Sequence, residues 1–146
     1  MHNVIVAIMM LLIWVPTVQA DSENDISAIK KTATTYMNSW YQGDARGMKA
    51  SLHKKLAKRS LKGMMGENEL RHTTASDMVS YTKSGYGERL WQNDLNIDVI
   101  VLDYFKNIAS VKVTTPHYYE YLHIAKIEGK WVILNALYEK NSPPQD

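Results

Sequence analysis

Residues 39–59 read SWYQGDARGMKASLHKKLAKR, and they decide how the N-terminal half of the chain is built. A helical stretch ends at Gln42, because Gly43 readily adopts the left-handed backbone that terminates a helix. Asp44 can then accept hydrogen bonds from the backbone N–H groups of a new first turn. We therefore predict two successive helices, the second of which carries an apolar face of Met48, Leu52 and Leu56.

The chain on either side of this segment also favours helix. Apolar residues upstream recur at three- and four-residue steps, so we predict a first helix from Asp25–Ile26 to Gln42 with Asp25 as its N-cap. The stretch that follows Leu56 is basic and irregular as far as Gly66, and we expect a loop there. A third helix is predicted over residues 75–84, capped by Thr74 or Ser76 and ended by Gly85.

The C-terminal half is rich in β-branched and aromatic residues that are divided by turn residues. This pattern predicts strands over 96–103, 108–115, 118–127 and 130–138. Helices followed by a meander of long strands are typical of an α+β fold. We expect a cone-shaped α+β fold in which N-terminal helices pack on an antiparallel sheet.

Residues 121–139 read YLHIAKIEGKWVILNALYE, which indicates a β-hairpin. If Glu128 and Gly129 form a two-residue turn, Ile127 lies opposite Lys130. One face of the hairpin then carries Tyr118, Glu120, Leu122, Ile124, Trp131, Ile133, Asn135 and Leu137. The other face carries Tyr119, Tyr121, His123, Ala125, Ile127, Val132, Leu134, Ala136 and Tyr138. A three-residue bulged turn would exchange these faces.

Both predicted faces of the hairpin are mostly apolar. An antiparallel sheet with one solvated side alternates apolar and polar residues, so each side needs a cover. The helices cover one side. We expect a second subunit to cover the other, which predicts a homodimer through the outer sheet face.

The first twenty residues have the features of a signal peptide. The apolar run Val4–Val15 is shorter than the ~20 residues that a membrane span requires. Pro16 ends the run, and small residues precede a cleavage position near Ala20. We therefore expect a periplasmic or secreted protein with one domain over 21–140 and a flexible tail over 141–146. An uncleaved anchor stays the alternative, because the first three residues lack Lys and Arg.

Composition narrows the class of partner. The 146 residues include no Cys, and the net charge of +2 gives no reason to expect binding to nucleic acid. The chain has nine Tyr and four Trp but one Phe. Tyr and Trp combine an apolar body with a polar group, which suits half-wet surfaces such as pockets.

Two sets of residues carry a resemblance to a known family. The first set is Trp40, Tyr41, Gly43, Asp44, Met48, Leu52, His53, Lys58 and Arg59, and the second is Tyr121, Leu122, His123, Gly129, Trp131 and Asn135. Together they resemble the "putative lumazine-binding" branch of the nuclear transport factor 2-like superfamily, to which SnoaL-like and ketosteroid isomerase-like proteins also belong. The resemblance implies a helix-packed cone with an open mouth, usually dimeric. It implies no reaction, since this superfamily includes isomerases, dehydratases and plain binding domains.

Glu120 is the candidate catalytic residue, because a carboxylate in apolar surroundings can act as a general base near neutral pH. Its alternative is a solvated position at the cone mouth or a pair with a Lys. Asn135, on the same predicted face, could orient a ligand or fix the sheet. His53 could hydrogen-bond a ligand or cap the second helix.

Aromatic side chains could wall a pocket for a flat or small hydrophobic ligand. The candidates are Tyr36, Trp40, Tyr81, Tyr118 and Trp131, although their spacing also suits ordinary core positions. The basic residues Lys54, Lys55, Lys58, Arg59 and Lys62 form a solvated helix face or, alternatively, a site for anions or acidic lipids.

Metal and cofactor sites are not expected. His117 and His123 lie six residues apart on one strand, roughly 20 Å, so they cannot chelate one ion. No phosphate loop or nucleophile motif occurs in the sequence. We therefore expect an exported small-molecule-binding protein without a cofactor. The alternatives are an isomerase or dehydratase that uses Glu120, and an assembly domain.

Overall fold

The structure is a computed structural model that describes residues 18–62, 69–91, 93 and 95–141. Its helices are α1 (Val18–Gln42), α2 (Ala45–Ser51), α3 (Ala75–Lys83) and the short 3-10 turn η1 (Glu88–Leu90). Its strands are β1 (Leu52–Lys62), β2 (Glu69–Thr73), β3 (Asp98–Phe105), β4 (Ile108–Thr114), β5 (Tyr118–Ile127) and β6 (Lys130–Lys140). Most of the predicted signal peptide and of the predicted tail lies outside these residues.

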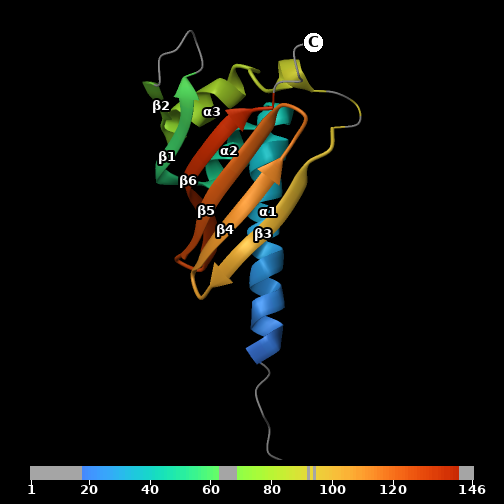
Figure 1. The fold of residues 1–146 in the computed structure, drawn as a ribbon, viewed down its shortest axis with the longest axis vertical. Coiled ribbons are helices and arrows are strands. Elements are labelled where there is room, and N and C mark those ends of the chain that lie inside the picture. Colours follow the sequence, from blue (N-terminus) through green and yellow to red (C-terminus); the bar gives the residue numbers. More distant parts are fainter. Residues whose placement is uncertain (1–17, 63–68, 92, 94, 142–146) are drawn as a thin grey trace, which may run out of the picture.

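The helices lie on one face of a single six-stranded sheet with the order β2-β1-β6-β5-β4-β3 (Figure 1). All neighbouring strands are antiparallel except β1 and β6, which are parallel. This arrangement confirms the predicted α+β fold, with N-terminal helices packed on a curved sheet. Among the described helices, none is long and apolar enough to cross a membrane.

The core lies between the helices and the inner face of the sheet, which is the face that the helices cover. Helix α1 contributes a fully buried stripe of Ile29, Ala33 and Met37. The facing sheet residues are Val111, Val113, Leu122, Ile124 and Ile133, each at most 1% exposed. Leu122, Ile124 and Ile133 lie on the face that the predicted hairpin register assigned to the helices.

Asp25 does not cap the first helix, as we had predicted, because α1 begins seven residues earlier at Val18. Instead its carboxylate accepts three hydrogen bonds from the sheet. The donors are Lys126 Nζ at 2.8 Å, Tyr104 Oη at 2.9 Å and Trp131 Nε1 at 3.0 Å. The side chain therefore fastens α1 to β3, β5 and β6.

The second helix begins as predicted and ends sooner than predicted. Gly43 has a φ of +67°, and Asp44 Oδ1 accepts hydrogen bonds from the N–H groups of Arg46 and Gly47. Helix α2 ends at Ser51, whereas we had predicted that it carries Leu52 and Leu56.

The stretch that we had expected to be helix and loop is strand β1, followed by the unpredicted strand β2. Strand β1 pairs with β6 on one side and with β2 on the other. These partners come from distant or unpredicted segments, so their hydrogen bonds override the local helix preference. Leu56, Lys58 and Ser60 are buried on the inner face, while Arg59 is exposed.

The hairpin turn follows the prediction, but the register changes halfway along it. Glu128 and Gly129 both have positive φ, and Ile127 pairs with Lys130. Ile124 pairs with Ile133, yet the next pair joins His123 to Asn135, so Leu134 is an extra residue that forms a β-bulge. Beyond the bulge our face assignment for β6 was wrong. Asn135 and Leu137 lie on the outer face, and Ala136 and Tyr138 lie on the inner face.

Candidate functional site

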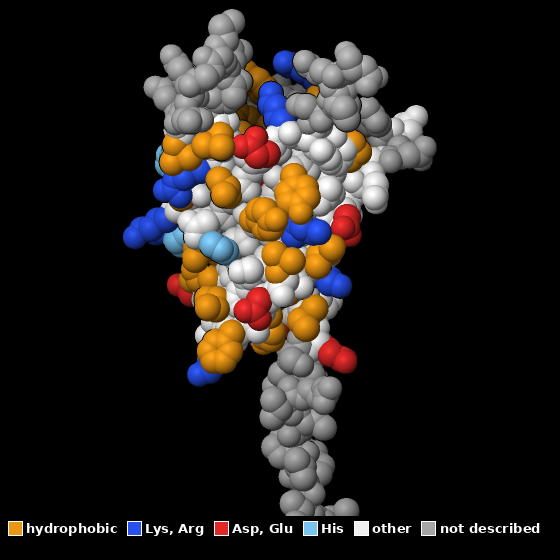
Figure 2. Space-filling view, viewed as in Figure 1, with side chains coloured by type: hydrophobic (Ala, Val, Ile, Leu, Met, Phe, Trp, Pro, Cys, Tyr) orange, Lys and Arg blue, Asp and Glu red, His pale blue; other side chains and the backbone are white. Residues whose placement is uncertain are grey.

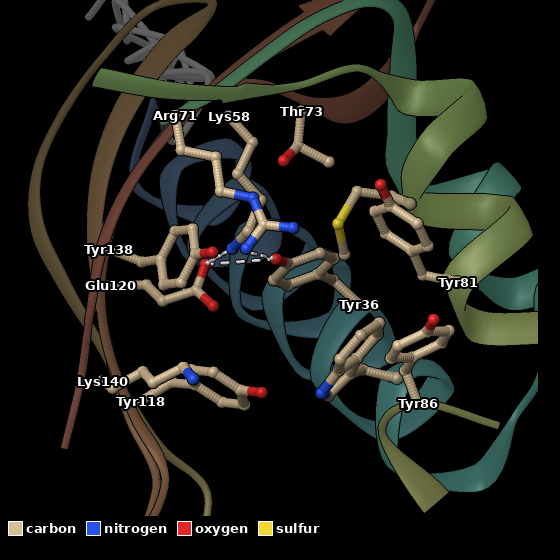
Figure 3. Close-up of a pocket in the computed structure, with 12 residues that line it drawn as sticks. Tyr36, Lys58, Arg71, Thr73, Tyr81, Tyr86, Tyr118, Glu120, Tyr138 and Lys140 are labelled. Carbon is tan, nitrogen blue, oxygen red and sulfur yellow. Dashed lines mark hydrogen bonds and ion pairs between the residues drawn. The ribbon is translucent and has the colours of Figure 1, made fainter. Parts of the chain in front are cut away.

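An aromatic cavity of about 360 Å³ opens between the inner face of the sheet and the helices (Figure 3). Its walls come from α1, α3, β1, β2, β5 and β6, and aromatic rings supply half of the lining. The lining residues are Tyr36, Trp40, Lys58, Arg71, Thr73, Met78, Tyr81, Tyr86, Tyr118, Glu120, Tyr138 and Lys140. Such a mixture of rings with a few polar groups is typical of small-molecule sites.

A buried cluster of Tyr36, Lys58 and Glu120 lies in the cavity wall. Lys58 Nζ donates to Glu120 Oε2 at 2.6 Å and to the Tyr36 hydroxyl oxygen at 2.8 Å. The Tyr36 hydroxyl donates to the same carboxylate oxygen at 3.1 Å. The side chains of Lys58 and Glu120 are only 6% and 3% exposed, so each charge depends on the other for compensation.

The Leu134 bulge completes the surroundings of the Lys58 ammonium group. Because the bulge shifts β6 by one residue, Tyr138 lies opposite Glu120 and points to the inner face. Lys58 Nζ lies 3.9 Å from the centre of the Tyr138 ring, a cation–π contact. Without the extra residue Tyr138 would point to the outer face.

Burial affects the protonation of two phenols in the cavity, Tyr36 and Tyr118. Burial and the neighbouring Glu120 carboxylate raise the pKa of Tyr36 well above its ordinary value. Burial also raises the pKa of Tyr118. Tyr36 therefore stays protonated near neutral pH and donates its hydrogen bond to Glu120.

One carboxylate oxygen of Glu120, Oε1, is left to interact with a ligand in the cavity. The hydrogen bonds from Lys58 and Tyr36 both end on Oε2, and the described part of the chain gives no donor to Oε1. Oε1 points towards the cavity interior (Figure 3). It can therefore accept a hydrogen bond from a ligand while the cluster stays intact.

Five of the eight side chains proposed from the sequence meet in this cavity. They are Tyr36, Trp40, Tyr81, Tyr118 and Glu120. Trp40 and Tyr118 pack edge to face with ring centres 6.4 Å apart, and Tyr118 contacts Tyr138 in the same way at 6.0 Å. Four of the five aromatic candidates thus lie in the cavity wall, and Trp131 does not.

The other three side chains do not line the aromatic cavity. His53 lies in β1 and accepts a hydrogen bond from the Lys55 N–H, so it does not cap a helix. The Trp131 indole is directed to Asp25. Asn135 lies beyond the Leu134 bulge on the outer face, opposite His123.

Sequence reasoning missed the cations of the cavity. We had placed Lys58 on a solvated helix face or in an anion site, but it lies on β1, where Leu56, Lys58 and Ser60 are buried on the inner face. Arg71 lies on β2, which the sequence analysis did not predict. It lies two residues before the buried Thr73, on the same face of β2.

Within ranges 18–62, 69–91 and 95–141, no group of three or more His, Asp or Glu side chains is placed to hold an ion. The rings and polar groups that line the aromatic cavity are suited to stacking on a flat group and to exchanging hydrogen bonds with it.

Comparison with known proteins identifies the family. Residues 24–139 match the family described as "putative lumazine-binding", and the chain belongs to this family. No curated protein matches the chain.

Solved structures with the same fold have low sequence identity. An NTF-2 like protein of unknown function from Silicibacter pomeroyi DSS-3 superposes with a TM-score of 0.64 at 15% identity, covering 82% of this chain and 98% of that one. An NTF2-like protein of unknown function from Methylobacillus flagellatus KT superposes with a TM-score of 0.61 at 19% identity, and the superposition covers 82% of this chain and 94% of that one. A ketosteroid isomerase-like protein from Erwinia carotovora atroseptica superposes with a TM-score of 0.60 at 16% identity, and the superposition covers 82% of this chain and 98% of that one. These similarities establish the fold.

Proposed function

We propose that this protein is an exported small-molecule-binding protein whose aromatic cavity takes a flat or small hydrophobic ligand. The observation that carries the proposal is the cavity itself. Six aromatic rings line about 360 Å³ above a buried cluster whose charges compensate each other. Pockets of roughly 300–1,000 Å³ with this kind of lining are suited to small organic molecules.

The state of Glu120 favours binding over catalysis. An isomerase or dehydratase of the kind considered above needs a carboxylate that can take a proton from the substrate. Glu120 is instead held by Lys58 and Tyr36, and its remaining oxygen is suited to orienting a ligand donor. Catalysis by Glu120 stays the second candidate, since Oε1 faces the cavity.

Native mass spectrometry tests the proposal with a matched pair of variants. Tyr118 lines the cavity, whereas Tyr119, its neighbour on β5, points to the outer face. The wild type and Tyr119→Ala should retain a one-to-one adduct after incubation with a library of small aromatic compounds. Tyr118→Ala should lose about 1–3 kcal/mol of binding free energy through lost stacking and burial.

Two outcomes of this experiment would contradict binding in the cavity. One is the absence of an adduct on the wild type across the whole library. The other is an adduct that persists equally on Tyr118→Ala. Conversion of a library compound by the wild type, with loss of turnover in Glu120→Gln, would favour the enzyme instead.

Export is supported by the apolar run Val4–Val15 and the small residues before Ala20. Intact-mass analysis of the protein recovered from the periplasm tests it. A mass that begins at Asp21 is expected. Retention of residues 1–20 on membrane-bound protein would favour the anchor.

A second copy of the chain is the proposed cover for the outer face. Figure 2 shows hydrophobic side chains gathered over the sheet on the side away from the helices. Exposed apolar residues of this face are Ile100, Leu102, Ile108, Tyr121 and Leu137, and they are 40–61% exposed. Several exposed apolar side chains on one face of a sheet are the feature that supports an interface here.

A further inference from the structure

We propose that the ligand of the aromatic cavity is an aromatic carboxylate, and that Arg71 binds its carboxylate group. The inference rests on the proposed function, because it names the ligand class for the same site. It depends on three observations: the charges in the cavity, the position of Arg71 on the sheet, and the geometry of its guanidinium group.

The charged groups of the cavity leave a positive excess. The lining contains Lys58, Glu120, Arg71 and Lys140. Lys58 and Glu120 form an ion pair and neutralise each other. Among the side chains that the structure describes, none forms an ion pair or a side-chain hydrogen bond with Arg71 or Lys140, and a ligand with a negative charge could pair with them.

The strand register directs Arg71 into the cavity. Strand β2 is antiparallel to β1, with Lys58 opposite Thr73 and Ser60 opposite Arg71. Lys58, Ser60 and Thr73 are all buried on the inner face, so Arg71, two residues from Thr73, shares that face. In Figure 3 its guanidinium group lies over the cavity, beside Lys58.

Lys58 itself is not available to an anion. Two of its N–H groups are used by Glu120 and Tyr36, and the Tyr138 ring lies against the ammonium group. Arg71, by contrast, offers up to five donors in a planar fork that matches a carboxylate in a bidentate manner. Arg71 is therefore the recognition group, and Lys58 is part of the wall.

The separation of Arg71 from Lys140 favours an acid with one negative charge, and the aromatic rings of the cavity favour a flat ligand. Strand β1 separates β2 from β6, so the backbones of Arg71 and Lys140 lie on the order of 10 Å apart across the sheet. Tyr138 and Glu120 lie between the two cations (Figure 3). Arg71 thus has no second cation beside it that is free to bind, which suits a carboxylate better than a doubly charged phosphate. The rings of Trp40, Tyr81 and Tyr118 are available to stack on the ligand body.

Calorimetric titration of the purified full chain tests this assignment with acid–amide pairs. The probes are 2-naphthoate and 2-naphthamide, then cinnamate and cinnamamide, and 2-naphthyl phosphate. Arg71→Gln is compared with Arg59→Gln, which removes the same charge from the exposed outer side of the neighbouring strand. Arg71 is exposed, so Arg71→Gln should keep the fold, which thermal melting verifies.

The wild type should bind each acid about tenfold or more tightly than its amide, as expected for a charge-assisted bidentate pair. Arg71→Gln should remove that preference and leave amide affinity within about twofold. Arg59→Gln should change neither affinity. Arg71→Lys, which keeps the charge and loses the fork, should retain only part of the preference.

Three results would overturn the assignment while the proposed function stands. They are equal binding of acids and amides, an acid preference that survives in Arg71→Gln, and Arg71-dependent binding of 2-naphthyl phosphate that is tighter than that of 2-naphthoate. If no acid and no amide binds the wild type, the cavity is not a site for such ligands, and the proposed function fails together with this inference.

Discussion

The ammonium group of Lys58 and the carboxylate of Glu120 show how much of this site depends on single residues. The two residues are 62 positions apart in the sequence, yet they form a 2.6 Å ion pair inside the cavity wall. Removal of either partner leaves a buried charge without compensation, whereas removal of both leaves none. The pair therefore acts as one unit in stability.

Lys58→Met and Glu120→Gln should each reduce the free energy of unfolding by about 3–5 kcal/mol. The double variant should lose much less than the sum, because the introduced amide can still accept from Tyr36 and no charge stays buried. Urea unfolding of the wild type and the three variants measures the coupling energy. Additive losses would show that the two groups do not compensate each other.

At the scale of elements, Asp25 controls how α1 is held on the sheet. Three donors from β3, β5 and β6 lower the pKa of its carboxyl from 3.8 to about 2, the hydrogen bond from Lys126 being the largest cause. Because the folded-state pKa lies below the ordinary value, the stabilisation is complete above about pH 4. It is lost as the pH falls from about 4 towards 2.

Asp25→Asn should therefore cost about 1–3 kcal/mol of unfolding free energy at pH 7 and progressively less as the pH falls towards 2. Thermal or urea unfolding across this pH range provides the measurement. Asp98→Asn, at an exposed position on β3, is the matched control and should have little effect at any pH. An Asp25→Asn loss that does not change with pH would contradict a role for the ionised carboxylate.

Local patterns predicted those elements whose signals lie within a few residues. The Glu128–Gly129 turn, the cap at Asp44 and the four C-terminal strands follow from neighbouring residues. Strand β1 could not be predicted in this way, because its strand character depends on pairing with the distant strand β6.

The candidate site was also predictable only in part, because some of its residues depend on strand pairing and register that local patterns do not show. Tyr36, Trp40 and Tyr118 were named as pocket candidates, although their helical and strand spacing suited ordinary core positions equally well. The face of Asn135 and Tyr138 could not be derived, because it depends on one extra residue, Leu134, that nothing in the local sequence marks. Arg71 was missed together with its strand.

At the scale of the whole molecule, the inner face and the outer face of the sheet have separate roles in our account. The inner face forms the cavity, and the outer face forms the proposed dimer interface. Tyr121 lies at the centre of the outer face, between Lys112 on β4 and Leu137 on β6, and is 47% exposed.

Tyr121→Lys should convert the dimer to a monomer. The new lysine places a second positive charge beside Lys112, and the two-fold symmetry of the dimer repeats this pair of charges in the same apolar interface. Light scattering coupled to size-exclusion chromatography measures the mass. Trp91→Lys, at a 46% exposed aromatic position off the sheet, is the control and should stay dimeric. A monomeric wild type would contradict the interface.

The binding site itself can be tested most directly through the tryptophan indole N–H signals during a titration with 2-naphthoate. Trp40 lines the cavity, whereas the Trp131 indole is hydrogen-bonded to Asp25 and Trp91 is exposed away from the lining. Our account predicts a saturable shift of the Trp40 signal while the Trp131 and Trp91 signals stay in place, and a shift that needs a higher ligand concentration to saturate in Tyr118→Ala. A Trp40 signal that does not move at saturating ligand, or that saturates at the same concentration in Tyr118→Ala, would contradict binding in the aromatic cavity.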